Sequence, residues 1–291
     1  MPELPDVETV RRSILPFVTG RAIVGAPVLL NAPRLIQTPS AEGFARMVLG
    51  LHILDVWRRA KYLLFPLVGK GLQTPRWYLV VHLRMTGHMD VVPTDAPPRR
   101  FDRLIFPLEG ALDLRFSDAR KLGKVWLVDH PEEATGPLGP EPLGEDFPPE
   151  TLRAMLKERH ASVKAVLVDQ ALIAGIGNIY ADEALWEARI LPTRRASGLS
   201  AEEVARLHTA IKDVLGRAVD KLASLLETRP TGFNPERYVF PWESDENASV
   251  EALSLLRVPR AAGKPCPRCG GPVQRVKVHA RGTYFCPSCQ K

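Results

Sequence analysis

All four cysteines of the chain lie near its C-terminal end, as two Cys-x2-Cys pairs that sixteen residues separate. This spacing is typical of a zinc site with four thiolate ligands. A segment of this size is too small to bury a core of its own, so metal binding would be what folds it. Because no coordination position is left open, we expect one structural zinc per chain. Its predicted ligands are Cys266, Cys269, Cys286 and Cys289.

The residues between the two cysteine pairs predict a β-hairpin. In "GGPVQRVKVHARGTYFC" three valines alternate with polar residues before an expected turn at 280–282, and Tyr284 and Phe285 follow it. The hairpin and its two cysteine-containing turns together predict a zinc ribbon.

The excess positive charge of the chain is confined to this ribbon. The net charge is +6, and residues 260–291 hold seven Lys and Arg with no Asp or Glu. The rest of the chain then has 32 basic and 33 acidic residues. A compact basic module on a near-neutral body favours a polyanion partner, because counterion release from nucleic acid supplies affinity. A solvated basic tail is the alternative interpretation.

Hydropathy and the N-terminal residues argue against the membrane and secreted classes. No apolar run approaches the roughly 20 residues that a membrane helix needs. The first residues carry Glu3, Asp6 and Glu8 where a signal peptide has its apolar region. We therefore expect a soluble intracellular protein, in which two disulfides are a poor alternative to zinc. With 291 residues and 45% apolar content, two or three domains can each bury a core.

The pattern of apolar residues changes along the chain. A first helix is predicted from the spacing of Val7, Val10, Ile14 and Phe17, ending at Pro16–Gly20. From about 22 to 128, short apolar runs such as "KYLLFPL" and "WYLVVHLRM" predict strands, and a β-sandwich or flattened barrel fits them best.

One hairpin and one helix are predicted in detail. In "RLIFPLEGALDLRFSD", residues 104, 106 and 108 should face residues 112, 114 and 116. Ser200 and Glu203 form a capping box for a long helix whose apolar stripe begins at Leu207. Further helices are expected near 152–156, 163–167 and 179–188.

We therefore predict an α+β multidomain protein. Its segments are a β-sandwich with a leading helix (1–130), a Pro- and Gly-rich linker (131–150), a helical domain (151–226), a segment that is hard to assign (227–262) and the zinc ribbon (263–291).

With these pieces placed, the chain resembles the bacterial formamidopyrimidine-DNA glycosylase family (Fpg/Nei). The resemblance covers nearly the whole chain. It is carried by "PELPDVET" at the start, "RRAKYLL" (58–64), "HLRMTG" (82–87), "SDARKLG" (117–123), "LGPEPL" (138–143), "DQALIAGIGNIYADEALW" (169–186) and the ribbon. It implies a β-sandwich, a helix–two-turns–helix domain and a zinc finger, with DNA held between the halves.

The resemblance gives the N-terminus a chemical role. Removal of Met1 would expose the secondary amine of Pro2, and an α-amino group titrates near 8, so part of it is neutral at pH 7. Attack on the sugar's anomeric carbon would expel the base and leave an iminium, with Glu3 as the acid for the ring oxygen. β- and δ-elimination would then nick the strand. An "MPE" start by itself would be an ordinary terminus.

The resemblance also assigns the DNA contacts. Lys61, His82, Asn178 and Arg281 would hold the phosphates around the lesion, with Lys61 and Arg281 also donating protons in the eliminations. Since the damaged base must leave the duplex, Met85 and Arg120 would fill the gap and contact the orphaned cytosine. The predicted DNA-binding residues are completed by Arg103, Leu122 and Lys164.

Taken alone, most of these residues have ordinary structural interpretations. Lys61 would be a surface charge, His82 a satisfied strand histidine, Asn178 a helix cap and Met85 a core residue. The expected partner is damaged double-stranded DNA, without a membrane partner, for a monomeric protein in the bacterial cytoplasm at the nucleoid.

The sequence departs from the family pattern at positions that bear on the substrate. Leu122 stands where the family usually has a phenylalanine wedge, and Phe101-Asp102-Arg103 replaces a His-x-His. Asp6 replaces the usual glutamate. Within 222–262 the family's Gly-Gly-Thr-Thr and Tyr-Gly-Arg stretches are absent, so whether this segment caps the flipped base is open.

Three functions are therefore weighed. The leading one is a bifunctional glycosylase and abasic-site lyase for oxidised purines, namely formamidopyrimidine and 8-oxoguanine. A Nei-like enzyme for oxidised pyrimidines or abasic sites is the second. A damage-binding protein without turnover is the third, and the joint presence of Pro2, Glu3 and Lys61 argues against it.

Overall fold

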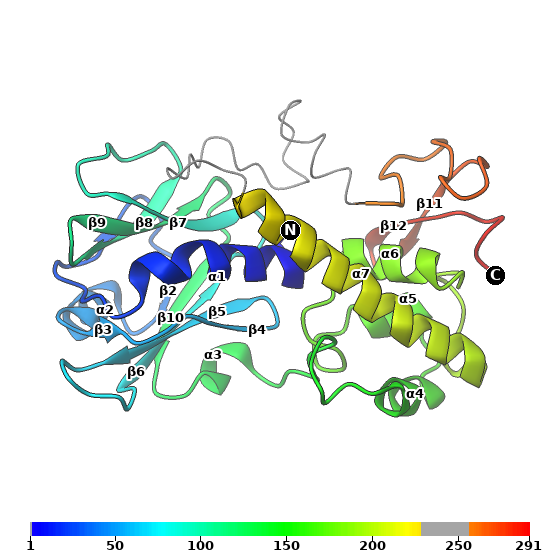
Figure 1. Cartoon of the computed structure of the whole chain (residues 1–291), viewed down its shortest axis with the longest axis horizontal. Helices are drawn as coiled ribbons and strands as arrows, with labels where there is room; N and C mark the ends of the chain where they lie inside the picture. Colours follow the sequence, from blue (N-terminus) through cyan, green and yellow to red (C-terminus); the bar gives the residue numbers. More distant parts are fainter. Residues whose placement is uncertain (1, 228–255) are drawn as a thin grey trace. The chain divides into compact units, whose positions relative to one another are not determined.

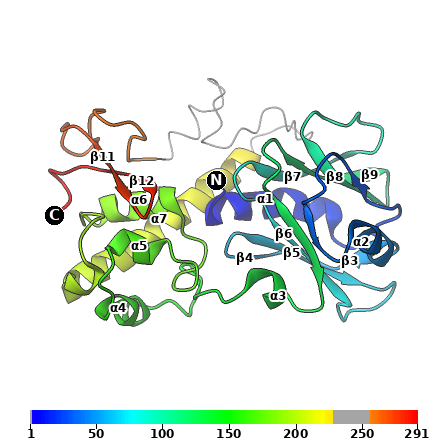
Figure 2. The ribbon, with the colours of Figure 1, turned by 180° about the vertical axis from the view of Figure 1, so that it is seen from behind.

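The structure, a computed structural model, describes residues 2–227 and 256–291. Those residues form two compact units (Figures 1 and 2). The N-terminal unit comprises Pro2 and Asp6–Pro137 with the last described turn of the long helix, and the C-terminal unit comprises Glu3–Pro5, Leu138–Lys221 and the described residues from 256 onward. Whether the 222–262 segment caps the flipped base concerns mainly residues 228–255, which lie outside the described residues.

The chain begins with helix α1 (Leu4–Val18), as predicted. Its fully buried stripe consists of Leu4, Val7, Val10, Ile14 and Val18. The prediction was wrong at Phe17, which is 51% exposed. The helix continues through Pro16, so Val18, one turn after Ile14, takes the last buried position.

Two sheets make up most of the N-terminal unit, as the strand pattern predicts. The first has the order β2-β10-β6-β5-β3, with β4 paired to β5. Its strands are β2 (Ile36–Thr38), β3 (His52–Ile53), β4 (Trp57–Arg59), β5 (Tyr62–Val68), β6 (Trp77–His82) and β10 (Lys124–Val128). The second has the order β1-β8-β9-β7. Its strands are β1 (Val28–Leu29), β7 (Gly87–Pro93), β8 (Asp102–Leu108) and β9 (Leu112–Asp118).

The register of the β8–β9 hairpin is confirmed. Leu104 pairs with Phe116, and Phe106 pairs with Leu114. Helix α2 (Ala41–Val48), which the sequence reasoning missed, places Phe44 against Phe106 with ring centroids 6.0 Å apart. A short helix, α3 (Glu132–Thr135), follows the last strand.

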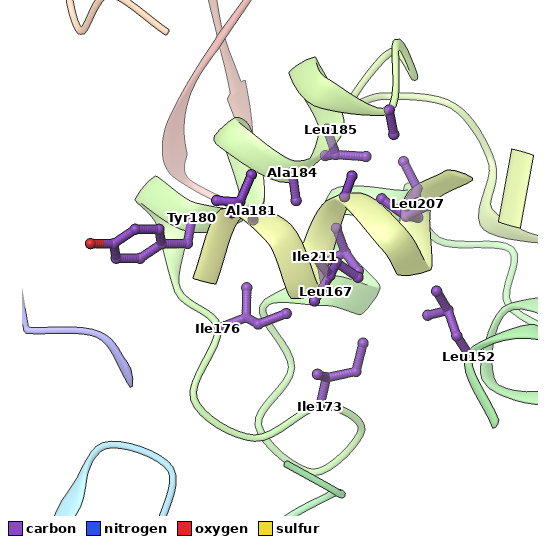
Figure 3. Close-up of a cluster of buried hydrophobic side chains, with 14 of the residues drawn as sticks. Leu152, Leu167, Ile173, Ile176, Tyr180, Ala181, Ala184, Leu185, Leu207 and Ile211 are labelled. Atoms are coloured by element: carbon purple, nitrogen blue, oxygen red, sulfur yellow. The ribbon is translucent and has the colours of Figure 1, made fainter. Parts of the chain in front are cut away.

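The C-terminal unit is built from helices around one apolar core (Figure 3). Its elements are α4 (Pro149–Lys157), α5 (Val163–Leu167), α6 (Asn178–Glu187), the 3₁₀ turn η1 (Ala196–Gly198) and α7 (Ala201–Glu227). The capping box of α7 is confirmed, because Ser200 N donates to Glu203 and Glu203 N donates to the Ser200 hydroxyl. Phe147, within the predicted linker, is also buried in this core.

The ribbon hairpin joins β11 (Gln274–Val278) to β12 (Arg281–Phe285). Its turn begins one residue earlier than predicted and consists of His279 and Ala280, which both have left-handed backbones, with φ of 46° and 61°. Positive φ at both central residues is what a tight two-residue hairpin turn requires. Arg281 is therefore the first residue of β12. In both views the hairpin lies beside α6 (Figures 1 and 2).

Among the described residues, the membrane search finds no helix that combines the length and the apolar character needed to span a bilayer.

Candidate active site

The Glu3 carboxylate occupies the N-terminal end of helix α6. It accepts hydrogen bonds from Gly177 N at 2.9 Å, Ile179 N at 2.8 Å and Tyr180 N at 3.1 Å. The first N–H groups of a helix have no partner within it, and the helix dipole favours a negative charge there. Only 1% of Glu3 is exposed. The carboxylate is therefore held in one position at a site that suits an anion.

The glycines before α6 leave just enough room for this arrangement. A Cβ at Gly177 would lie 2.3 Å from Glu3 Cδ, closer than any real contact. Gly175 has a φ of +89°, and its carbonyl accepts the Leu4 N–H at 3.1 Å. Three amides of this turn and of the first helical residues therefore bind the chain's own Glu3.

Pro2 is bonded directly to Glu3, and it is buried. Because Glu3 is fixed by three hydrogen bonds and Leu4 by a fourth, the backbone from which Pro2 extends is fixed as well. The structure thus places the predicted nucleophile one residue from a firmly held carboxylic group.

Lys61 and His82 lie in the N-terminal unit, at the ends of neighbouring strands. Lys61 is buried and follows Ala60, whose φ of 53° marks a tight turn between β4 and β5. His82 ends β6, and its ring meets the Tyr62 ring edge-on at 4.6 Å. The burial of Lys61 differs from that of a surface lysine, and the His82 ring has a position defined by its contact with Tyr62.

The backbone determines which nitrogen of His82 carries the proton. Arg84 N donates to His82 Nδ1 at 2.9 Å, so the hydrogen of the neutral ring is on Nε2. Burial, together with the positive charges of Arg84 and Lys61, lowers the pKa of His82 to about 3. A neutral ring with its hydrogen on Nε2 is suited to donate one hydrogen bond to a phosphate across the physiological pH range.

The ionisation of His82 can be measured directly. We expect ¹⁵N NMR of the DNA-free protein to show the Nε2–H tautomer and no His82 titration between pH 8 and about pH 5. Because the pKa of His82 is lower in the folded than in the unfolded protein, the free energy of unfolding decreases as pH falls below about 6.5. A titration midpoint near 6.5 would contradict the arrangement.

The residues predicted to fill the gap lie in two loops of the N-terminal unit. Met85 is half-buried between β6 and β7, next to Arg84, which has a φ of 58°. Arg120 and Leu122 lie between β9 and β10, on either side of Lys121, and Leu122 is 42% exposed. An exposed leucine with no buried role is consistent with the wedge position.

Arg103 is buried, and its hydrogen bonds are internal. Its guanidinium donates to the carbonyls of Asp118, Arg100 and Asp102 at 2.9–3.1 Å. The neighbouring Phe101 is 42% exposed, with the Arg100 guanidinium 5.1 Å from its ring centroid. Direct DNA binding by Arg103 stays a prediction, and the structure gives this residue a role in shaping its loop.

Lys164 and Asn178 hold the ribbon hairpin against the helices. Lys164 is 0% exposed, and its ammonium donates to Asp182 at 2.5 Å and to the Thr283 hydroxyl at 2.7 Å. Asn178 Nδ2 donates to the Gly282 carbonyl at 2.9 Å. Both contacts fix the strand that begins at Arg281, which is itself exposed. Their predicted direct DNA contacts remain predictions.

Sequence reasoning missed the acidic residues that complete this attachment. Asp182 also accepts from Arg260 at 2.6 Å and from Tyr284 N at 3.1 Å. Glu183 accepts from the backbone of Arg257 and Val258, and burial raises its pKa to about 7. The sequence signal that could have identified them is the adjacent pair Asp182 and Glu183 in the middle of a largely apolar helix.

The four cysteine sulfurs form a site of the right size for zinc. All four Sγ atoms lie within 4.8 Å of one another. The Sγ atoms of Cys266 and Cys289 lie 3.9 Å apart, and those of Cys269 and Cys286 lie 3.5 Å apart. Around a tetrahedral zinc ion with Zn–S bonds of about 2.3 Å, the expected Sγ–Sγ distance is roughly 3.8 Å. These separations exclude disulfides, whose sulfurs lie about 2.05 Å apart. The residues fit one structural zinc.

The ribbon is also attached to the helices through this site. Trp186 Nε1 donates to Cys266 Sγ at 3.4 Å, and the Arg268 guanidinium lies 3.8 Å from the Trp186 ring centroid. The small apolar cluster here consists of Trp186, Val258, Cys266, Val273 and Cys286.

Zinc removal should therefore act on one part of the protein. We expect a strong chelator to abolish binding to duplex DNA, while the N-terminal unit keeps its thermal unfolding transition, because among the described residues no member of the ribbon cluster comes from its sheets. Calorimetry and a gel-shift assay on the same sample measure both quantities. Loss of the whole folded signal would contradict this expectation.

Family models match all three parts of the chain. The formamidopyrimidine-DNA glycosylase N-terminal domain matches residues 1–125, and the formamidopyrimidine-DNA glycosylase H2TH domain matches 138–229. A zinc finger found in FPG and IleRS matches 263–291. The cysteine cluster lies within the last of these regions.

Known proteins match over the full length. A formamidopyrimidine-DNA glycosylase from Symbiobacterium thermophilum is 45% identical and covers 100% of the chain and 89% of that protein, and one from Pelotomaculum thermopropionicum is 40% identical with coverage of 100% and 99%. Among solved structures, MutM in complex with carbocyclic 8-oxo-G containing DNA is 32% identical, with a TM-score of 0.82 and full coverage of both chains. The Lactococcus lactis Fpg complex with abasic-site DNA is 30% identical, with a TM-score of 0.81 and 99% coverage of each. The chain thus belongs to the formamidopyrimidine-DNA glycosylase family.

Proposed function

We propose that this DNA glycosylase of base excision repair removes oxidised purines, formamidopyrimidine and 8-oxoguanine, from duplex DNA and then cleaves the strand. The observation that carries the proposal is the Glu3 carboxylate, held by three backbone N–H groups and bonded directly to Pro2. Solved relatives with bound 8-oxo-G and Fapy-dG DNA support the substrate class.

The first steps use the two leading residues. Once Met1 is removed, the Pro2 nitrogen attacks the anomeric carbon, and the bond to the base breaks with its electron pair leaving on the base. Glu3 protonates the ring oxygen, the ring opens, and an iminium joins the sugar to Pro2. The proton and the nucleophile thus come from adjacent residues, so a single backbone position sets both.

Strand cleavage follows from the iminium. It acidifies the hydrogen on the neighbouring sugar carbon, whose loss expels the 3′ phosphate, and a second elimination expels the 5′ phosphate. Lys61 and Arg281 are the proposed proton donors to these steps. Lys61 is a buried residue in the N-terminal unit, and Arg281 is exposed at the start of β12 in the C-terminal unit.

The proposed partner is damaged double-stranded DNA, contacted by both units. The N-terminal unit supplies Lys61 and His82, and the C-terminal unit supplies Asn178 and Arg281. We further propose that the protein acts as a monomer, without a membrane partner, in the cytoplasm at the nucleoid. The basic ribbon favours binding that weakens as salt rises.

A second candidate is excision of oxidised pyrimidines or action on abasic sites alone. It is favoured by Leu122, an exposed leucine where the family usually has a phenylalanine. Leucine can still enter a base step, but it offers less stacking than an aromatic ring.

A panel of four duplexes separates these candidates. Each carries 8-oxoguanine, formamidopyrimidine, thymine glycol or an abasic site, and single-turnover cleavage is measured for each. We expect the first two to be cleaved faster than thymine glycol. Cleavage of only thymine glycol and abasic duplexes would reject the purine assignment, and binding without cleavage of any duplex would favour the damage-binding alternative.

A further inference from the structure

Asp118 is a fully buried carboxylate at the end of strand β9, and none of the assigned DNA contacts includes it. Its Oδ1 accepts from the Thr86 hydroxyl at 2.5 Å and from Arg120 N at 3.1 Å. Its Oδ2 accepts from Leu122 N and from Gly123 N, both at 2.7 Å. Four donors from two loops therefore converge on one side chain.

The backbone of Asp118 holds a third loop. Asp118 N donates to the Phe101 carbonyl at 2.8 Å, and the Asp118 carbonyl accepts from Arg103 Nε at 2.9 Å. The loop before β8, which carries the exposed Phe101, is thereby fixed to the end of the same strand. Through side chain and backbone together, Asp118 contacts the segments around Met85, Leu122 and Phe101.

The loop between β9 and β10 depends on these bonds for its shape. Lys121, between the predicted gap-filling residues, has a φ of 54°, a backbone that a residue with a side chain rarely adopts. A Cβ at Gly123 would lie 2.3 Å from Phe116 Cζ and 3.2 Å from Asp118 Oδ2. The loop is thus strained and tightly packed, and the carboxylate supplies the hydrogen bonds that hold it.

The chemistry of the four donors requires a carboxylate at this position. All four are N–H or O–H groups, and an ionised carboxylate has enough acceptor sites for them without a hydrogen of its own. An asparagine of the same shape would turn an NH₂ group toward two donors and leave them unpaired. Buried donors without partners are costly, so the loops would move apart to reach water.

We propose that Asp118 is a positioning residue that sets the Met85, Arg120 and Leu122 segments as one unit. This inference rests on the proposed function, in which these side chains fill the gap that the flipped base leaves. Thr86 is the second member of the arrangement, because its hydroxyl joins Asp118 Oδ1 and also accepts from Arg120 N at 3.2 Å. It connects the Met85 loop directly to the Arg120 loop.

The test uses full-length Asp118→Asn and Thr86→Val, with Asp113→Asn as the control. Asp113 is a buried aspartate on the same strand, and its partners Arg115 and Thr94 lie outside the loops that carry Met85, Arg120 and Leu122. The probe is a duplex with a tetrahydrofuran abasic analogue and 2-aminopurine next to the unpaired cytosine. Its fluorescence reports entry of side chains into the gap, and it needs no catalysis.

We expect Asp118→Asn to lose most of the fluorescence change at saturating protein, Thr86→Val to lose part of it, and Asp113→Asn to keep it. Excision from a lesion-containing duplex should fall by about tenfold or more in Asp118→Asn. Nicking of an abasic site in a single strand, which has no gap to fill, should stay within about twofold of the parent protein.

Two results would overturn the proposal. One is an unchanged fluorescence response in a folded Asp118→Asn variant. The other is an equal loss in the duplex and single-strand assays together with a lowered melting temperature, which would make Asp118 a general stabiliser. Failure of the proposed function is distinguishable from both, because the parent protein would then leave the 8-oxoguanine and formamidopyrimidine duplexes uncleaved while still giving the fluorescence response.

Discussion

A Pro2→Gly variant is expected to bind lesion-containing duplex DNA with nearly unchanged affinity and to lose borohydride trapping by about 100-fold or more. The imino nitrogen of Pro2 is the proposed nucleophile, whereas the proposed phosphate contacts all come from other residues. Glycine keeps a primary α-amine, but it lacks the ring that fixes the backbone angle before Glu3. Trapping is measured on gels, and affinity is measured by fluorescence anisotropy.

The control for this variant is Glu3→Gln. It keeps the nucleophile and removes the acid, so base excision should be lost while nicking of a preformed abasic site persists. If both variants reduced binding, excision and nicking equally, their effects would reflect misfolding of the N-terminal segment and not chemistry.

A Gly177→Ala variant is expected to lose base excision by about 100-fold, although this glycine has no reactive group. The added methyl would lie 2.3 Å from Glu3 Cδ, so the carboxylate would be displaced from the three N–H groups that hold it. General acid catalysis typically contributes about 10²- to 10⁴-fold, and a displaced Glu3 forfeits it. Nicking of abasic DNA should persist, as in Glu3→Gln.

Gly216→Ala is the matched control for Gly177→Ala. Gly216 lies within α7, and a Cβ there would meet nothing within 4 Å. Alanine in a helix interior should raise the free energy of unfolding by about 0.5–1 kcal/mol and leave excision unchanged. Full excision activity in Gly177→Ala would show that the position of Glu3 does not matter to the reaction.

The sequence predicted much of the fold because several signals were local. The capping box at Ser200 and Glu203 depends on residues three apart, and the β8–β9 register follows from alternation around one tight turn. The zinc ligands follow from spacing alone. Each of these features involves neighbours along the chain, so no knowledge of distant contacts is needed.

The wrong sequence predictions concern features that tertiary packing determines. Phe17 and Val18 both fit the helical pattern, and only the surrounding core selects Val18 for burial. Helix α2 is short, and its apolar residues at 44 and 48 resemble those of a strand segment. The hydrogen bonds from Gly177 N and Ile179 N to Glu3 could not be predicted, because the partners lie 174 and 176 residues apart along the chain.

The sequence proposes the residues of the candidate site but does not reveal their geometry. Pro2, Glu3 and Lys61 are identified by motifs, but the hydrogen bonds that position Glu3 come from a glycine turn in another region of the chain. The Lys164 ammonium and the Arg103 guanidinium both make buried internal hydrogen bonds, which the sequence does not reveal. Burial of a charge depends on tertiary partners such as Asp182, and no local pattern reveals them.

The proposed reaction depends most on the leading residue of the mature protein. Intact-mass spectrometry of active protein, before and after borohydride trapping on lesion DNA, tests it directly. We predict a mass that lacks Met1, and after trapping a single sugar remnant on the peptide that begins with Pro2. A retained Met1 or an acetylated first residue in fully active protein, or an adduct on Lys61, would contradict the account.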